Sequence, residues 1–219
     1  MNINDKKIAF LGDSITFGVG ASSPQKVYWK QIEEKSGAIC QGLGINGTRI
    51  AKQISPQPDA YHDVNHFITR VNRIDKDTDI IMVLGGVNDF AHGDAPLGKM
   101  TDRREDTFYG ACHLLYSELI ENFPLAAIVI MTPLHCANED NDLFNEKGLR
   151  QNGKLLDYVN IIKEVAEEYS LPVLDLYRIS GIQPKIQIQR DLFMPDGIHP
   201  NDKGYERIAD RIIAFLQSL

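Results

Sequence analysis

The sequence has few cysteines, and their arrangement excludes two common kinds of scaffold. Its 219 residues include only three, Cys40, Cys112 and Cys136, which lie far apart. An odd number of widely spaced cysteines does not form a disulfide framework, and without a Cys-x-x-Cys pair the usual zinc-binding spacing is missing. A chain of this length can bury a sufficient core without either device, so we expect residues 1–219 to form a single domain.

Long apolar runs are also missing. The first run, Ile8–Leu11, has four residues and ends at Gly12. A secretory signal requires roughly 7–15 apolar residues after a basic start, and a membrane-spanning helix requires about 18. We therefore expect no membrane span, and we expect a cytoplasmic protein with reduced thiols.

Positive charge is in deficit. Lysine and arginine together number 23 and aspartate and glutamate number 30, which gives a formal net charge of −7. Nucleic acids and anionic membranes both require a basic surface, so this balance argues against both partners. With 43% apolar and 24% charged residues, the composition is that of a globular protein and excludes a disordered, collagen-like or coiled-coil chain.

Short apolar runs alternate with longer amphipathic stretches, and this alternation predicts an α/β fold. The continuous apolar runs are typical of strands buried on both faces of a parallel sheet. The expected strands are residues 7–11, 38–42, 79–84, 126–131 and 173–176, and the expected helices are residues 28–35, 60–74, 107–122, 152–169 and 202–216. The pattern predicts a doubly wound, flavodoxin-like sheet of five parallel strands in the order 2-1-3-4-5.

Polar motifs follow several of these strands, at the edge of the sheet where ligands bind in open α/β folds. Gly12–Thr16 follows the first strand and places Ser14 on the first strand-to-helix turn. A serine there can be a nucleophile, or it can cap the following helix, a role that serine and Asp13 both serve well. The motif alone leaves both interpretations open.

A second motif lies just before the last helix, where Asn201 is expected to act as the cap. Asp196 and His199 are separated by two residues in a predicted loop. A serine nucleophile needs a base, and a carboxylate can orient the imidazole of that base. The alternative is a histidine that is an ordinary surface residue of the loop.

A third motif, Gly85–Asp89, follows the third strand. The amide of Asn88 can donate a hydrogen bond to a developing oxyanion. Alternatively, Asn88 or Asp89 caps its own backbone in a turn.

Two further patterns are expected to carry no cofactor or metal chemistry. Gly42–Gly47 matches the Gly-x-Gly-x-x-Gly dinucleotide fingerprint, but it follows the second strand, so we interpret it as a chance match whose Gly47 amide can face the same pocket as Ser14. His62 and His66 are four residues apart, with Asp63 where a metalloprotease needs glutamate. Without an evident third ligand, we expect a solvated helix face and no metal.

Taken together, these blocks resemble the SGNH hydrolase family, also called GDSL esterases and lipases. The blocks are Gly-Asp-Ser-Ile-Thr around Ser14, Gly-Ile-Asn-Gly-Thr around Gly47, Gly-Val-Asn-Asp around Asn88, and Asp-Gly-Ile-His from Asp196 to His199. The first block has isoleucine in place of the leucine in the family's name. The four blocks occur in the order typical of the family and together span Gly12–His199, nearly the whole chain.

The resemblance implies an α/β/α sandwich and hydrolysis of carboxylic esters without a metal or organic cofactor. It implies that Ser14 attacks the acyl carbonyl, that His199 takes its proton and that Asp196 orients His199. It also implies an oxyanion hole made by the backbone amides of Ser14 and Gly47 and the side chain of Asn88. The expected partner is a small-molecule ester.

The substrate is less well specified by the sequence. The stretch at residues 90–106 is long and polar, which favours a short acyl group on a polar or sugar alcohol. The alternatives are a lysophospholipase or thioesterase of the same family, or a non-enzymatic nucleotide-binding module of flavodoxin-like fold. The oligomeric state and the role of residues 179–191 are not specified.

Overall fold

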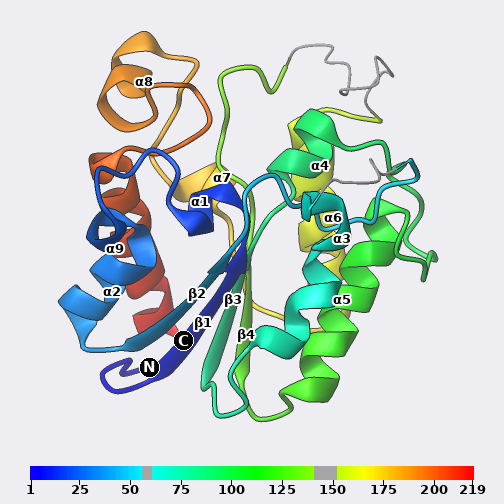
Figure 1. The fold of residues 1–219 in the computed structure, drawn as a ribbon, viewed down its shortest axis with the longest axis horizontal. Coiled ribbons are helices and arrows are strands. Elements are labelled where there is room, and N and C mark those ends of the chain that lie inside the picture. Colours follow the sequence, from blue (N-terminus) through cyan, green and yellow to red (C-terminus); the bar gives the residue numbers. More distant parts are fainter. Residues whose placement is uncertain (56–60, 141–151) are drawn as a thin grey trace.

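The protein forms a five-stranded parallel sheet, seen in a computed structural model that describes residues 1–55, 61–140 and 152–219 (Figure 1). The strand order is β2-β1-β3-β4-β5, as predicted. All neighbouring strands pair in parallel. The strands are β1 (Lys7–Gly12), β2 (Ile39–Gly44), β3 (Ile80–Leu84), β4 (Ala127–Met131) and β5 (Val173–Leu174).

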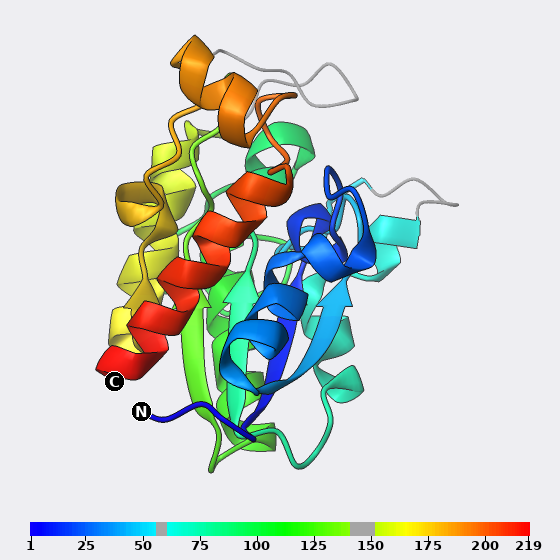
Figure 2. The same cartoon turned by 90° about the vertical axis from the view of Figure 1, so that its left-hand side faces the viewer.

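Helices cover both faces of the sheet, which gives the expected α/β/α sandwich. Figure 2 shows α2 (Tyr28–Ser36) and α9 (Asp202–Ser218) in front of one face, whereas α5 (Phe108–Asn122) and α6 (Leu155–Glu168) lie on the other face (Figure 1). Alternate residues of β3 belong to different cores, because successive side chains of a strand point to opposite faces. Ile81 and Val83 join the core under α5 and α6, and Ile80 and Met82 join the core under α2 and α9.

In the described residues, seven shorter elements lie in the connections between the strands and the long helices. They are α1 (Ser14–Phe17), η1 (Pro24–Lys26), α3 (Tyr61–Val64), η2 (Phe67–Arg73), α4 (Val87–His92), α7 (Leu176–Ile179) and α8 (Gln187–Phe193). η1 and η2 are 3₁₀ helices. α8 begins within residues 179–191, the segment that the sequence left unassigned, and continues to Phe193. α4 continues to His92 and so shortens the loop expected from residue 90.

The prediction of one continuous helix over residues 60–74 is wrong. Its expected start, residue 60, lies outside the described residues, and the remainder divides into α3 and η2. The Asn65 side chain donates to the Tyr61 carbonyl at 2.7 Å, so it takes the acceptor that a helical backbone bond would use. His66 is then extended (ψ 161°). His66 is also buried, with its Nε2 3.3 Å from Glu105, so it is not on a solvated helix face.

Other boundaries differ by a few residues. The fifth strand ends at Leu174 rather than at residue 176, because Asp175 caps α7 by accepting a hydrogen bond from the Arg178 N–H. The second strand continues to Gly44. Asn201 caps α9 as predicted, with its side chain accepting from the Gly204 N–H at 3.1 Å.

The carboxyl ends of the three adjacent strands β2, β1 and β3 lie at one level, and this alignment positions the candidate site. In the register of the sheet, Gly12 is opposite both Gly44 and Leu84. The loops that carry Ser14, Gly47 and Asn88 therefore start side by side. Across the described parts of the chain, no helix combines the length and the apolar character needed to cross a bilayer.

Candidate active site

Ser14 is the first residue of α1, but it is not the helix cap. Asp13 is the cap, and its Oδ1 accepts a hydrogen bond from the Ile15 N–H at 3.0 Å. The cap interpretation of Ser14 is therefore wrong, and its hydroxyl is available for another partner. That partner is the imidazole of His199, with 2.9 Å between Ser14 Oγ and His199 Nε2.

Asp196 holds the other side of the imidazole. His199 Nδ1 donates to Asp196 Oδ2 at 2.7 Å, while Asp196 Oδ1 accepts from the backbone N–H groups of Ile198 and His199 at 2.9 and 2.7 Å. With the proton of the ring on Nδ1, Nε2 can accept a proton from the Ser14 hydroxyl. His199 is therefore part of a Ser–His–Asp chain rather than an isolated residue of a surface loop.

The environment of Asp196 keeps its carboxylate ionised. Burial alone would raise its pKa, but the N–H groups of His199 and Ile198 and the His199 ring outweigh this effect and hold the pKa below its ordinary value. An ionised Asp196 fixes the tautomer of His199 and stabilises the imidazolium that forms when His199 takes a proton.

Three contacts join the segment after α1 to the start of α9 and so bring His199 to Ser14. The Tyr205 hydroxyl donates to the Val19 carbonyl at 2.7 Å. The backbone N–H and the hydroxyl of Ser22 donate to the two carboxylate oxygens of Asp202 at 2.8 and 2.6 Å. A Cβ on Gly20 would lie 2.5 Å from the Pro200 carbonyl oxygen, so only glycine allows this close approach.

The loop of Gly47 and the side chain of Asn88 are joined directly. Asn88 Nδ2 donates to the Thr48 carbonyl at 3.1 Å, which leaves its second N–H for another acceptor. Gly47 has φ +69°, a left-handed conformation that favours glycine. In the part of the chain that the structure describes, no group accepts a hydrogen bond from the backbone N–H of Ser14 or Gly47.

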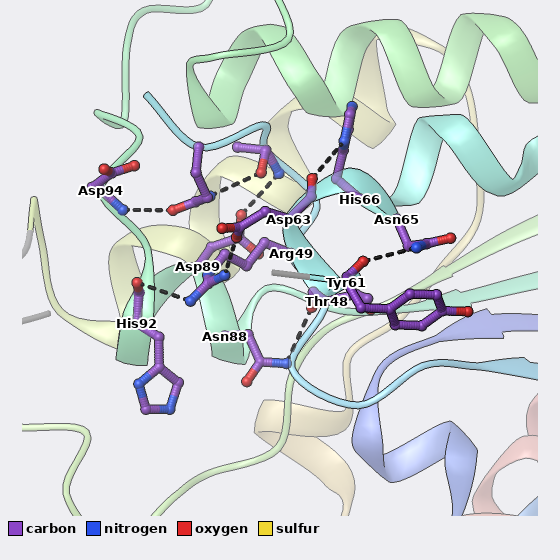
Figure 3. Close-up of polar contacts among 12 residues, drawn as sticks. Thr48, Arg49, Tyr61, Asp63, Asn65, His66, Asn88, Asp89, His92 and Asp94 are labelled. Carbon is purple, nitrogen blue, oxygen red and sulfur yellow. Dashed lines mark hydrogen bonds and ion pairs between the residues drawn. The ribbon is translucent and has the colours of Figure 1, made fainter. Parts of the chain in front are cut away.

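Asp89 anchors the same loop further along the chain (Figure 3). Its two carboxylate oxygens accept from the N–H groups of Ile50 and Ala51, both at 2.9 Å. Burial raises the pKa of Asp89 to about 6. The Asn88 side chain bonds to Thr48 and not to its own backbone, and Gly86 stands at the N-cap of α4. The Asp89 carboxylate does interact with its own backbone N–H, in addition to its bonds to Ile50 and Ala51.

Arg70 is a buried residue of the site that the sequence analysis did not identify. Its side chain is 1% exposed and donates to three oxygens: the Gly12 carbonyl at 3.0 Å, the Leu43 carbonyl at 2.7 Å and Thr48 Oγ1 at 3.0 Å. It therefore joins the end of β1 to both ends of the loop that carries Gly47. The sequence contained a signal that Arg70 is buried: at helical spacing, it shares one stripe with the apolar residues Phe67, Val71 and Ile74.

Gly42 and Gly44 are packed closely against neighbouring residues. A Cβ on Gly42 would lie 2.4 Å from the Trp29 ring, and one on Gly44 would lie 2.1 Å from the Phe17 backbone nitrogen. These contacts agree with the interpretation of the glycine pattern as local rather than as a dinucleotide site. Within the described residues, no group of three or more His, Cys, Asp or Glu side chains is placed to hold a metal ion.

Comparison with known proteins finds a matching family and similar proteins. The model of the "GDSL-like Lipase/Acylhydrolase family" matches residues 10–207. A curated relative, a multidomain esterase from Ruminococcus flavefaciens, is 28% identical over 229 residues, which cover 92% of this chain and 27% of the relative. The chain thus spans just over a quarter of that relative's length.

Solved structures share the fold over nearly the whole chain. A protein from Lactobacillus plantarum is 30% identical, with a TM-score of 0.82 and 98% of each chain covered. An acetyl xylan esterase is 21% identical, with a TM-score of 0.64 and coverage of 96% of this chain and 99% of the other.

Burial of Asp13 predicts a pH dependence of stability. Burial raises the pKa of Asp13 to about 6, so the folded state binds its proton more tightly than the unfolded chain does. Its contribution to stability is complete below about pH 4 and is lost as the pH rises through about 6. Between pH 5 and pH 8 this group alone should lower the free energy of unfolding by about 1.4 kcal/mol, since one pKa unit corresponds to about 1.36 kcal/mol.

The Asp13→Asn variant should lose this part of the pH dependence, which urea unfolding at pH 5 and pH 8 measures. Asp5→Asn removes a carboxylate from an exposed position and serves as the control. Identical pH dependence in the wild type and Asp13→Asn would contradict the assignment.

Proposed function

The chain belongs to the GDSL-like Lipase/Acylhydrolase family, a family of carboxylic ester hydrolases, and we propose that it cleaves esters through a covalent acyl-enzyme on Ser14. The observation that carries this proposal is the continuous hydrogen-bonded chain from Ser14 through His199 to Asp196. A serine hydroxyl is a weak nucleophile, and an adjacent oriented base is what activates it.

The reaction has two steps. Ser14 Oγ forms a bond to the acyl carbon while His199 Nε2 takes the hydroxyl proton, and the ester C–O bond then breaks as His199 returns that proton to the departing alcohol. In the second step, water gives a proton to His199 and attacks the acyl carbon. The acid leaves, and Ser14 regains its proton.

The negative charge that develops on the carbonyl oxygen needs preorganised donors. The candidates are the backbone N–H groups of Ser14 and Gly47 and the free N–H of the Asn88 amide. The bonds from Arg70 and Asp89 keep the loop of Gly47 in place, so these donors need little reorganisation during the reaction.

For the substrate we propose a short acyl group on a polar or sugar alcohol. The cavity beside Gly47 offers a polar alcohol the side chains of Asn46, Tyr61 and Arg73, next to the apolar residues Phe17, Leu43 and Ile45. Thioesters and lysophospholipids would react through the same groups, and a substrate panel separates them. A nucleotide-binding module is not favoured, because in the described residues no long helix opens after Gly42–Gly47 to present its N-terminus to a phosphate: the next helix, α3, begins at Tyr61 and has four residues.

We propose that residues 1–219 act as a single domain on a small-molecule ester, without nucleic acid, metal or cofactor. The three cysteines are unpaired, which supports a cytoplasmic location where thiols stay reduced.

The first test removes the nucleophile. Ser14→Ala should abolish hydrolysis of 4-nitrophenyl acetate while the far-UV circular dichroism stays that of the wild type, because only the attacking oxygen is lost. Ser117→Ala removes a hydroxyl that bonds within its own helix and should retain full activity. Undiminished turnover by Ser14→Ala would end the proposal.

The second test removes a donor to the oxyanion. Asn88→Ala should lower kcat about 10²–10³-fold with a small change in KM, because the interaction is made chiefly in the transition state. Asn122→Ala, at the exposed end of α5, is the matched control. A loss of less than tenfold would remove Asn88 from this role.

A further inference from the structure

A cavity of about 500 Å³ borders the loop that carries Gly47. Its walls include Phe17 from α1, Leu43 from the end of β2, Asn46 from the loop itself, and Tyr61, Arg70 and Arg73 from α3 and η2. Asn46 directly precedes Gly47, and Phe17 lies one helical turn after Ser14. The cavity is therefore adjacent to the candidate oxyanion hole on the side of β2.

Two guanidinium groups contribute to this cavity without a directly bonded carboxylate. Arg70 donates only to carbonyl and hydroxyl oxygens, and Arg73 donates to the Asn65 side-chain carbonyl at 2.6 Å. In the described ranges, neither has an aspartate or glutamate oxygen within 4.0 Å. Burial lowers the pKa of Arg70 to about 10, so it remains charged at neutral pH.

This arrangement is unusual for an acidic protein. The chain has a net charge of −7, yet the two charged residues among those that line this cavity are both arginines. Burying the charge of Arg70 costs free energy; the carboxylate of Asp13 offsets this in part, whereas the neighbouring Arg73 adds like-charge repulsion. An anionic ligand in the cavity would reduce that cost, because the attraction between charges is stronger where water is partly excluded.

Two exposed aromatic side chains belong to the same cavity. Phe17 is 60% exposed and Tyr61 is 62% exposed. Figure 3 shows Tyr61 beside Thr48, which lies in the loop that carries Gly47. Aromatic faces of this kind provide contact area for a ring- or chain-shaped carbon skeleton, while the arginines provide charge.

We propose that this cavity binds an anionic group of the ester substrate, a carboxylate or phosphate, with Arg73 as its charged contact and with Phe17 and Tyr61 against the carbon skeleton. The inference rests on the proposed function and refines its substrate to an anionic ester. A guanidinium contact to an anion is charge-assisted, and its loss weakens binding by about tenfold or more.

The test compares matched neutral and anionic esters by kcat/KM. For an anion on the acyl side, mono-4-nitrophenyl succinate is compared with 4-nitrophenyl pentanoate. For an anion on the alcohol side, acetylated methyl glucuronoside and acetylated glucose 6-phosphate are compared with acetylated methyl glucoside. The wild type should prefer the anionic member of at least one pair by tenfold or more, mainly through KM.

Arg73→Gln should reduce that preference about tenfold. Arg103→Gln removes the same charge from a surface pair with Glu168 and should leave the preference unchanged. Equal treatment of all pairs by the wild type, or an unchanged preference in Arg73→Gln, would overturn the proposal.

A binding measurement separates this inference from the proposed function. Calorimetric titration of Ser14→Ala with methyl glucuronoside, glucose 6-phosphate, succinate and methyl glucoside requires no hydrolysis. Tighter binding of an anionic compound supports the cavity even if no ester is cleaved, in which case only the proposed function fails. Equal or absent binding of all four, together with hydrolysis of neutral esters, would overturn the cavity alone.

Discussion

The contact between Ser14 and His199 is the interaction on which the rest of the site depends. The two residues are 185 positions apart in the chain, and their reactive atoms are 2.9 Å apart. The parallel sheet places Ser14 at the end of β1, and the bonds of Tyr205 and Ser22 bring the start of α9 to the same place. Because the contact is made by tertiary structure, any change that separates α9 from the segment after α1 should also separate His199 from Ser14.

The loop of Gly47, which carries a proposed oxyanion donor, is held by buried polar groups as well as by the apolar packing of Ile50 and Ala51. Arg70 joins the end of β1 to the loop of Gly47, and Asp89 binds the next residues of that loop. Such groups are costly to bury, and Asp13, Asp89 and Arg70 all show shifted pKa values for this reason. The free energy of unfolding is thereby reduced, while a donor arrangement is maintained that does not have to form during the reaction.

The sequence was sufficient to predict the strand order, because apolar runs mark buried strands. The motifs also named Ser14, Asp196 and His199, whose side chains the structure brings within hydrogen-bonding distance. The sequence was not sufficient for contacts that depend on three-dimensional neighbours. The break between α3 and η2 results from one side-chain bond of Asn65. The partners of Arg70 are carbonyls of distant strands, which no local pattern specifies. The choice between Asp13 and Ser14 as the cap was also open, because both residue types cap helices equally well.

The most direct test of the account is covalent labelling with a fluorophosphonate, followed by peptide mass spectrometry. An activated serine at this site predicts one adduct per chain, on the peptide that contains Ser14, and much slower labelling in His199→Ala because the base is missing. No adduct on the folded wild-type protein, or an adduct confined to another residue, would contradict the account.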